Sequence, residues 1–386
     1  MKILLIGGVS KSLINFRKEL IWEFINMGEE VWACAGEPKH EITKELISWG
    51  VNYIPISCER ASISPLRDLK LLIQLHGIIN EIKPDIVLTY TIKPIIWGNI
   101  ASVFTRKCKV YSMIEGLGYT FMPIESLKQF ISSIVAKVLY KVSLVKSKMV
   151  FFLNPDDLDL FVRRKIVSSK KTKLLNGIGI DINDFNYSKE TKKSNSIRFL
   201  MIARLLKDKG IYEYINAAKT FINDNTIKFD LAGGLDPNPT AMKEKELLSL
   251  TQNGIINYLG VLDNVKKAYS DCDVYVLPSY REGTPRTVLE AMAIGRAIIT
   301  TDAPGCKETI NVKGCRMIGQ LKIGKNGIII PVKNVNALIE AIVFLSTNPQ
   351  LVKEMGRESR KYAVERYDVK NVNRVILEKM GFLNEL

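Results

Sequence analysis

Short apolar runs alternate with amphipathic stretches along this chain, and they do so in two separate series. The first series of strand-like runs occupies 2–8, 30–36, 51–57, 85–91 and 109–116. The second occupies 197–204, 227–234, 255–260, 274–279, 297–302 and 326–332. Apolar strands that alternate with helical patterns are typical of parallel sheets covered by helices on both faces. The alternation therefore predicts an α/β protein with two Rossmann-like, doubly wound domains that face a cleft.

A polar segment without apolar periodicity separates the two series. We expect an N-terminal domain over 1–182, a linker over 183–196, a C-terminal domain over 197–366 and, over 367–386, a helix that packs back across the domains. A chain of 386 residues is long enough for two such domains, each with its own core. Ligands of doubly wound sheets bind beyond the carboxyl ends of the strands, so functional residues are expected in the loops that follow them.

The chain is strongly basic, with a formal net charge of +15. Such an excess calls for an anionic partner, which can be a nucleic acid, a membrane surface or a phosphorylated substrate. A coding bias toward lysine is the alternative explanation. No nucleic-acid module is visible, and the basic residues are not interleaved with stacking aromatic side chains. We therefore predict no nucleic-acid partner.

Cysteine and histidine usage argues against a metal centre. The six cysteines are scattered without a CxxC pair, and the two histidines, His40 and His76, complete no zinc-ligand spacing. We expect reduced thiols and a cytoplasmic protein. The N-terminal MKILLIGG is typical of a first buried strand rather than of a signal peptide. No charge-free apolar stretch reaches the roughly 18 residues that a membrane-spanning helix needs.

Two glutamates, Glu282 and Glu290, stand eight apart around a predicted strand–turn–helix unit. Thr284 and Pro285 read as a helix start, with a hydroxyl N-cap followed by proline at the first helical position. Glu282 would then lie in a turn whose free backbone N–H groups can hold a phosphate. Glu290, inside the helix, could bond ribose hydroxyls. The alternative is a capped helix with two ordinary surface glutamates.

The wider context resembles a known family. The pattern E-G-T-P-x-x-x-L-E-A-M-A-x-G over 282–295, followed by PGCKETI over 304–310, resembles the nucleotide-sugar signature of the retaining glycosyltransferases of family 4, which have the GT-B fold. A second matching piece, MIARLLKDKG over 201–210, carries Arg204 and Lys209. Further pieces match at 230–234, 258–265, 270–279 and 326–332. The resemblance covers nearly the whole chain in the family's order.

The resemblance implies a donor site for a UDP-sugar. Arg204 and Lys209 would bind the donor diphosphate and neutralise the charge that grows on the leaving UDP, through preorganised electrostatics. Glu282 would hold sugar hydroxyls, so the resemblance implies catalytic roles for Arg204, Lys209 and Glu282. Donor-binding roles are also implied for Gly8, Gly260, Val261, Gly283, Thr284 and Glu290. Since Asp271-x-Asp273 reads as the start of a buried strand, we predict no metal ion, no cofactor and metal-independent activity.

On the acceptor side, the loop VSKSLINFR over 9–17 resembles a segment of capsule and O-antigen transferases. The resemblance implies an acceptor-binding role for Asn15, Arg17, Gly116 and Gly118. Many family members carry a histidine near the reacting sugar, whereas this sequence has Glu115 at that place. Glu115 is therefore our candidate catalytic carboxylate, which would take the acceptor proton or hold a sugar by hydrogen bonds.

The stretch 121–150 combines an apolar face at helical spacing with five lysines at 128, 137, 141, 146 and 148. Basic amphipathic helices of this kind bind anionic headgroups. The alternative is an ordinary domain helix that buries its apolar face.

The sequence thus predicts a retaining hexosyltransferase on the inner face of the cytoplasmic membrane. It would transfer a hexose or N-acetylhexosamine from a UDP-sugar to an undecaprenyl-diphosphate-linked saccharide during synthesis of a surface polysaccharide or glycan, as N-acetylgalactosaminyltransferases of this family do. The alternatives are an enzyme like the UDP-GlcNAc epimerases, whose clustered histidines are not found here, and an inactive scaffold of the same fold.

Overall fold

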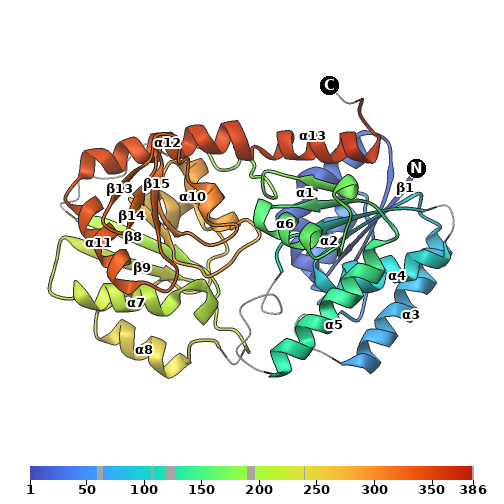
Figure 1. The fold of residues 1–386 in the computed structure, drawn as a ribbon, viewed down its shortest axis with the longest axis horizontal. Helices are drawn as coiled ribbons and strands as arrows, with labels where there is room; N and C mark the ends of the chain where they lie inside the picture. Colours follow the sequence, from blue (N-terminus) through green and yellow to red (C-terminus); the bar gives the residue numbers. More distant parts are fainter. Residues whose placement is uncertain (59–63, 106–107, 118–126, 189–195, 239, 385–386) are drawn as a thin grey trace. The chain divides into compact units, whose positions relative to one another are not determined.

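The computed structural model describes the chain except for residues 59–63, 106–107, 118–126, 189–195, 239 and 385–386 (Figure 1). The described residues form two compact units. Unit 1 comprises Met1–Ile178 and Val372–Leu386, and unit 2 comprises Gly179–Asn371. Each unit is built on its own sheet, which confirms the predicted α/β class with two doubly wound domains.

The sheet of unit 1 has strand order β3-β2-β1-β4-β5-β6-β7, with every neighbouring pair parallel. Its strands are β1 (Lys2–Gly7), β2 (Glu30–Ala35), β3 (Asn52–Pro55), β4 (Ile86–Tyr90), β5 (Lys109–Ile114), β6 (Ser147–Phe152) and β7 (Thr172–Leu174). The order reverses between β1 and β4, because β2 and β3 lie on one side of β1 and the later strands on the other. Ligands of doubly wound sheets bind at such a reversal.

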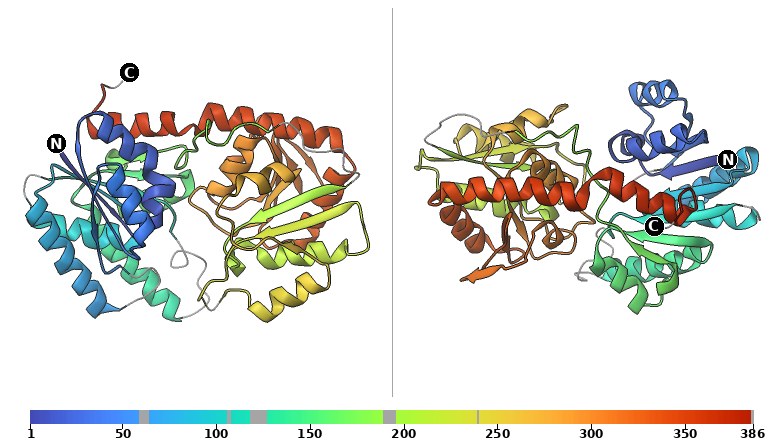
Figure 2. Two further views of the ribbon diagram at one scale, coloured as in Figure 1. Left: turned by 180° about the vertical axis from the view of Figure 1, so that it is seen from behind. Right: turned by 90° about the horizontal axis from the view of Figure 1, so that it is seen from above.

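Helices cover both faces of this sheet (Figure 2). Side chains alternate along β1, where Ile3 and Leu5 point to one core and Leu4 and Ile6 to the other. The first face packs α1 (Ser10–Asn26), α2 (His40–Ser48) and α13 (Val369–Met380). The second face packs α3 (Pro65–Ile82), the π-helical turn η1 (Pro94–Gly98), α4 (Asn99–Ala101), α5 (Leu127–Leu144) and α6 (Pro155–Arg163).

The sheet of unit 2 has strand order β10-β9-β8-β11-β12-β15-β14-β13. Its strands are β8 (Ile197–Ile202), β9 (Ile227–Ala232), β10 (Asn257–Tyr258), β11 (Val274–Leu277), β12 (Ala297–Thr301), β13 (Arg316–Ile318), β14 (Leu321–Ile323) and β15 (Gly327–Ile330). The first six in this order pair in parallel, and β14 and β13 add an antiparallel edge that the sequence did not predict. The helices are α7 (Ile211–Thr220), α8 (Glu244–Gln252), α9 (Lys266–Asp271), α10 (Arg286–Ile294), α11 (Val335–Ser346) and α12 (Pro349–Tyr367).

The segment predicted as a linker, 183–196, is packed on unit 2 where the structure describes it. Phe185 is buried in the core of that unit, and the Ser188 carbonyl accepts a hydrogen bond of 2.8 Å from Arg296. Its first residues therefore serve as part of the domain rather than as a free linker.

Over the part of the chain that the structure describes, no single helix is long and apolar enough to cross a membrane. Helices α11 and α12 are long and apolar enough only when they are taken together, and they meet at a bend of 102°. Apolar side chains of both helices lie in the core of unit 2.

Candidate functional site

In unit 2, the loops that follow β8 and β11 are joined at the carboxyl edge of the sheet. The Asp208 carbonyl accepts a hydrogen bond from the Tyr280 amide at 2.9 Å. Gly210 has a φ of +76°, and a Cβ there would overlap the Pro278 carbonyl. Only glycine therefore allows the two loops to approach this closely.

The joined loops bring Lys209 against Glu282. The Lys209 ammonium lies 2.6 Å from Oε1 of Glu282, and the Ser279 hydroxyl donates to the same oxygen at 2.8 Å. Both members of the ion pair are partly exposed. The structure thus unites two predicted catalytic residues that are 73 positions apart and fixes the Glu282 carboxylate by two donors.

Arg204 follows β8 and forms a separate ion pair. Its Nη1 lies 2.9 Å from Oδ2 of Asp236, in the loop after β9, and the Arg204 side chain remains 43 % exposed. Gly260 and Val261, two of the predicted donor-binding residues, follow β10 beside this loop, where the Gly260 carbonyl accepts from the Gly233 amide at 2.9 Å. Val261 is exposed, so its side chain is open to a ligand.

Glu290 lies in α10 and is nearly buried. It accepts hydrogen bonds from Nε of Arg286 at 2.8 Å and from the Tyr269 hydroxyl at 2.9 Å. Burial and the nearby Glu290 carboxylate raise the pKa of Tyr269 well above its ordinary value, so this phenol stays protonated and donates. Glu290 is therefore held in one orientation at the surface of its helix.

The predicted start of α10 was wrong by one residue. The helix begins at Arg286, and Pro285 stands at the N-cap with extended backbone angles of φ −72° and ψ 107°. The Thr284 hydroxyl donates to the Gly283 carbonyl at 2.9 Å instead of capping the helix. Gly283 and Thr284 nevertheless lie just before the N-cap residue Pro285, where their amides remain candidates for phosphate contacts.

In unit 1, Arg17 and Glu115 form an ion pair across 98 positions of sequence. Arg17 projects from α1, and Glu115 follows β5. The Arg17 side chain is only 3 % exposed, because the ring of Tyr90 covers its guanidinium with 4.6 Å between guanidinium carbon and ring centroid. The Tyr90 hydroxyl is 3.1 Å from that of Ser12. Burial raises the pKa of Tyr90, which keeps the phenol neutral beside the guanidinium.

Two glycines at the end of β1 leave room for the side chains of Tyr90 and Thr91. A Cβ at Gly7 would overlap the Tyr90 ring, and one at Gly8 would come 2.9 Å from the Thr91 hydroxyl. Gly8 thus lies at the carboxyl edge, next to the reversal of strand order. Position 7 requires glycine, because the Tyr90 ring occupies the space that a side chain would take.

The predicted acceptor residues do not all gather at this edge. Asn15 is exposed on α1, and two residues along a helix it points away from Arg17. Gly116 follows Glu115 with a φ of +148°. Gly118 lies outside the described residues. Arg17 contacts Glu115, so its influence on an acceptor would pass through that carboxylate.

Several residues at these edges were not predicted from the sequence: Tyr90, Asp236, Tyr269, Ser279 and Arg286. The spacing of Arg286 and Glu290, four apart on a helix, was a usable signal. Tyr90 ends a predicted strand, which also places it at the carboxyl edge. Tyr269 and Asp236 meet their partners only through the tertiary fold, and no local pattern points to them.

Within the described ranges, no three His, Cys, Asp or Glu side chains cluster in a way that could hold a metal ion. Asp273 immediately precedes β11, and its carboxylate accepts from the Arg198 amide at 2.8 Å, which confirms its predicted place at a strand start. Metal-independent activity remains a prediction.

Each half of the chain matches a known protein family. "Glycosyl transferases group 1" matches residues 183–362, and "Glycosyl transferase 4-like" matches residues 2–152. The chain is 28 % identical over 379 residues to N,N'-diacetylbacillosaminyl-diphospho-undecaprenol alpha-1,3-N-acetylgalactosaminyltransferase of Campylobacter jejuni, with 95 % of each chain covered. It is 25 % identical to UDP-Gal:alpha-D-GlcNAc-diphosphoundecaprenol alpha-1,3-galactosyltransferase of Escherichia coli, covering 84 % of this chain and 81 % of that one.

Solved structures share the fold at lower identity. A glycosyltransferase from Rickettsia africae aligns with a TM-score of 0.75 at 18 % identity, covering 100 % of this chain and 99 % of that one. The Anabaena protein HepE, solved in complex with UDP, aligns with a TM-score of 0.73 at 19 % identity, covering 99 % and 100 %. These similarities establish the fold.

Proposed function

Because this chain belongs to the family 4 glycosyltransferases with the GT-B fold, we propose that it transfers a hexose or N-acetylhexosamine, with retention, from a UDP-sugar to an undecaprenyl-diphosphate-linked saccharide. The Campylobacter and Escherichia relatives are named for activities on undecaprenol-diphosphate-linked sugars, which supports this acceptor class. Synthesis of a surface polysaccharide or glycan is the corresponding process.

The observation that carries the proposal is the pair of accessible cations at the carboxyl edge of unit 2. Lys209 and Arg204 are each held by a carboxylate, and their side chains remain 17 and 43 % exposed. A donor diphosphate would exchange for these carboxylates and meet cations that are already in place. Fixed charges of this kind stabilise the negative charge that develops on departing UDP, without reorganisation during the reaction. Glu282, freed from Lys209, would bond sugar hydroxyls.

On the acceptor side, Glu115 is the proposed partner of the attacking hydroxyl. Arg17 fixes one of its oxygens, and Tyr90 keeps water from the guanidinium. A carboxylate held in this way can accept the hydroxyl proton or orient the acceptor by hydrogen bonds. The oxygens of the leaving diphosphate can assist the same deprotonation, so no covalent intermediate on the protein is required.

The proposal is tested by UDP release over a panel of UDP-sugars, each with undecaprenyl-diphosphate-linked acceptors. We expect turnover with one UDP-hexose or UDP-N-acetylhexosamine, dependent on the lipid-linked saccharide, with the anomeric configuration of the donor kept in the product. Activity should persist in EDTA. Conversion of UDP-GlcNAc without acceptor would favour the epimerase alternative, and no turnover with any pair would favour a scaffold.

We further propose that α5 attaches the protein to an anionic membrane at the inner face of the cytoplasmic membrane. Its outward side carries Phe130, Ile131, Ile134, Val135, Val138 and Val142, each between 44 and 57 % exposed. Its buried side includes Ser133 and Ser143. Tyr140 and Leu144 anchor α5 in the core of unit 1. An ordinary domain helix would bury its other large apolar residues as well, so the six exposed ones disfavour that alternative. Lys141 is exposed on the same helix, and Lys148 is exposed at the start of β6.

Vesicle co-sedimentation tests this attachment. Replacing Lys137, Lys141, Lys146 and Lys148 with glutamine should release the protein from anionic vesicles, since each lysine near such a surface contributes about 1 kcal/mol. A control with the same net charge replaces four exposed lysines of unit 2: Lys243, Lys245, Lys361 and Lys370. Binding should weaken steeply with salt, because screening acts within about 10 Å at 0.1 M. Equal loss in both variants would contradict a specific role for α5.

A further inference from the structure

Helix α3 presents a second row of exposed apolar side chains on unit 1. Leu66, Leu69 and Ile73 are 82, 51 and 64 % exposed. They recur at intervals of three and four residues, so they form one stripe along the helix. The opposite side of α3 is the ordinary one, with Leu71, Leu75 and Ile79 buried in the core. The stripe is therefore additional to what packing on the sheet requires.

The stripe lies in the same helical layer as α5. Both helices pack on η1 and α4, which lie between them on the second face of the sheet (Figure 1). The outward sides of α3 and α5 thus form two apolar ridges on one face of unit 1. Exposed Val103, which follows α4, adds a further apolar side chain to this layer.

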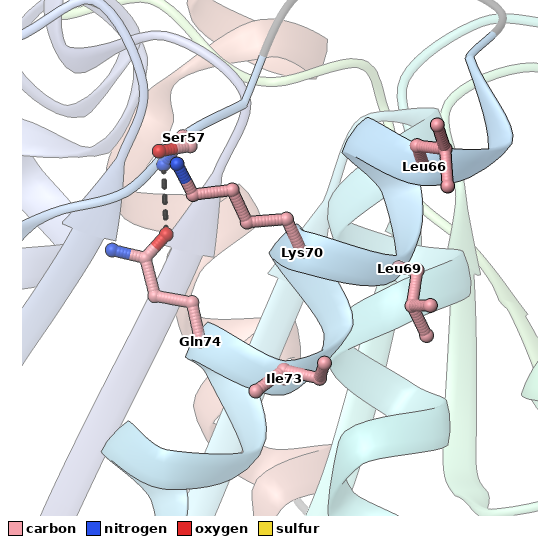
Figure 3. A pocket seen from close by; sticks show the side chains of 6 residues that line it. All are labelled: Ser57, Leu66, Leu69, Lys70, Ile73 and Gln74. Atoms are coloured by element: carbon pink, nitrogen blue, oxygen red, sulfur yellow. Dashed lines mark hydrogen bonds between the residues drawn. The ribbon is translucent and has the colours of Figure 1, made fainter.

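Beside the stripe is a hollow with one apolar and one polar wall. It has a volume of about 510 Å³ and is lined by Ser57, Leu66, Leu69, Lys70, Ile73 and Gln74 (Figure 3). In Figure 3 the three apolar side chains project from one side of α3, whereas Lys70 and Gln74 extend toward Ser57. Gln74 is fixed there, since its Oε1 accepts from the Ser57 amide at 2.9 Å.

The charges around the two ridges favour an anionic surface as the partner. Lys70 is exposed at the margin of the stripe, and the nearby Asp68 is neutralised by Lys93 at 2.8 Å. Along 127–149 the chain has five lysines and no Asp or Glu. An apolar ridge flanked by lysines suits the boundary between acyl chains and anionic headgroups, where stems are buried and ammonium groups stay in water.

We propose that α3 docks on the same anionic bilayer as α5, so that unit 1 is held by two apolar ridges rather than by one helix. Leu66, Leu69 and Ile73 enter the acyl boundary, and Lys70 lies at headgroup depth. This inference rests on the proposed membrane attachment through α5. Two ridges fix the tilt of unit 1 on the membrane, which a single helix leaves free to rotate.

A fluorescent label reports whether α3 enters the bilayer. Cys315 is the exposed cysteine among the six, so the labelling background is Cys315→Ser. An environment-sensitive dye is then placed at Ile73→Cys in α3, at Val138→Cys in α5 or, as a control, at Leu248→Cys in unit 2. With phosphatidylglycerol-containing vesicles, the dyes in α3 and α5 should shift to the blue and be quenched by brominated lipid, whereas the control dye should not.

The outcomes separate the two proposals. A shift at 138 without one at 73 overturns the role of α3 and leaves the attachment through α5 standing. A shift at neither position overturns both, and neither result depends on transferase activity. A shift at 73 that appears without vesicles, together with self-association in sedimentation velocity, identifies a second copy of the chain as the occupant and also overturns the inference.

A substitution test measures how much α3 contributes. The variant Leu66→Ser/Leu69→Ser/Ile73→Ser should partition into these vesicles about tenfold or more weakly. The matched control is Ile222→Ser/Leu248→Ser/Val343→Ser, three side chains of unit 2 that are 49, 53 and 44 % exposed. Because all six side chains are exposed, both variants should fold. Equal partitioning of the α3 variant and the control would overturn the proposal.

Discussion

Both units place an ion pair at the carboxyl edge of their sheet, but water reaches the two pairs to different degrees. In unit 1 the Arg17 side chain is sealed under Tyr90. In unit 2 both members of the Lys209–Glu282 pair are partly exposed, and Arg204 is open. A cation that water reaches can exchange its carboxylate for a phosphate, whereas a sealed cation acts through the partner that it holds. The cations of unit 2 are therefore suited to binding, and Arg17 is suited to positioning.

The largest expected effect comes from removing an open cation. Lys209→Ala and Arg204→Ala should each lower kcat by about 10²–10³, or about 2.7–4 kcal/mol, because each removes a preorganised charge that acts mainly in the transition state. UDP release under saturating donor measures this. Lys207→Ala is the matched control, since Lys207 is an exposed lysine in the same turn. Unchanged kcat in both variants would contradict the assignment of the diphosphate site.

Removing the sealed cation should misplace Glu115. Arg17→Met keeps an unbranched side chain but removes the guanidinium that holds the Glu115 carboxylate. Misplacement of a reacting group costs up to about 10²-fold in rate, so we expect kcat to decrease within that limit, as measured by UDP release.

A conservative variant separates positioning from folding. Removing one partner of a buried pair destabilises a protein by about 3–5 kcal/mol, so thermal unfolding must be measured alongside kcat. Arg17→Lys retains the charge and should restore most of the lost kcat. A kcat that falls only in proportion to the loss of folded protein would show that Arg17 supports only the fold.

The held carboxylate of α10 should affect donor binding rather than turnover. Glu290→Ala should raise the donor KM about tenfold with little change in kcat, because ribose contacts are equally strong in the ground and transition states. Tyr269→Phe removes one of the donors that orient Glu290 and should raise KM less. Initial rates over a range of donor concentrations measure both values. An unchanged KM in Glu290→Ala, or a loss confined to kcat, would remove Glu290 from the ribose site.

The predicted residues Glu282 and Glu290 of unit 2 are close in sequence, whereas Arg17 and Glu115 of unit 1 are far apart in sequence. Glu282 and Glu290 belong to one loop and the helix after it, so their spacing fixes their positions. Arg17 and Glu115 meet only because β1 and β5 bring α1 and a distant loop to one edge of the sheet. Their pairing, and the cover provided by Tyr90, depend on strand order, which no local pattern encodes.

Helices α10 and α5 show a second limit of prediction from periodicity. Both have apolar residues at helical spacing, yet Val288, Leu289 and Met292 of α10 are fully buried, whereas α5 buries Tyr140 and Leu144 but leaves six large apolar residues exposed. Periodicity identifies the apolar side of a helix but not what covers it. The serines on the inner side of α5 were the available signal, since a core-facing helix rarely turns small polar residues inward.

The smallest expected effect concerns the carboxylate that holds Arg204. Asp236→Asn removes the competitor that a donor phosphate must displace, so the donor KM should fall. Partly exposed ion pairs contribute about 0.2–1 kcal/mol, which limits the change to about fivefold or less. Asp184→Asn is the matched control, because Asp184 forms an exposed pair with Lys266 at 2.5 Å in the same unit. A lower kcat in Asp236→Asn, with KM unchanged, would mean that Asp236 orients Arg204 for the reaction. Arg204 would then resemble the positioned Arg17 rather than an open cation.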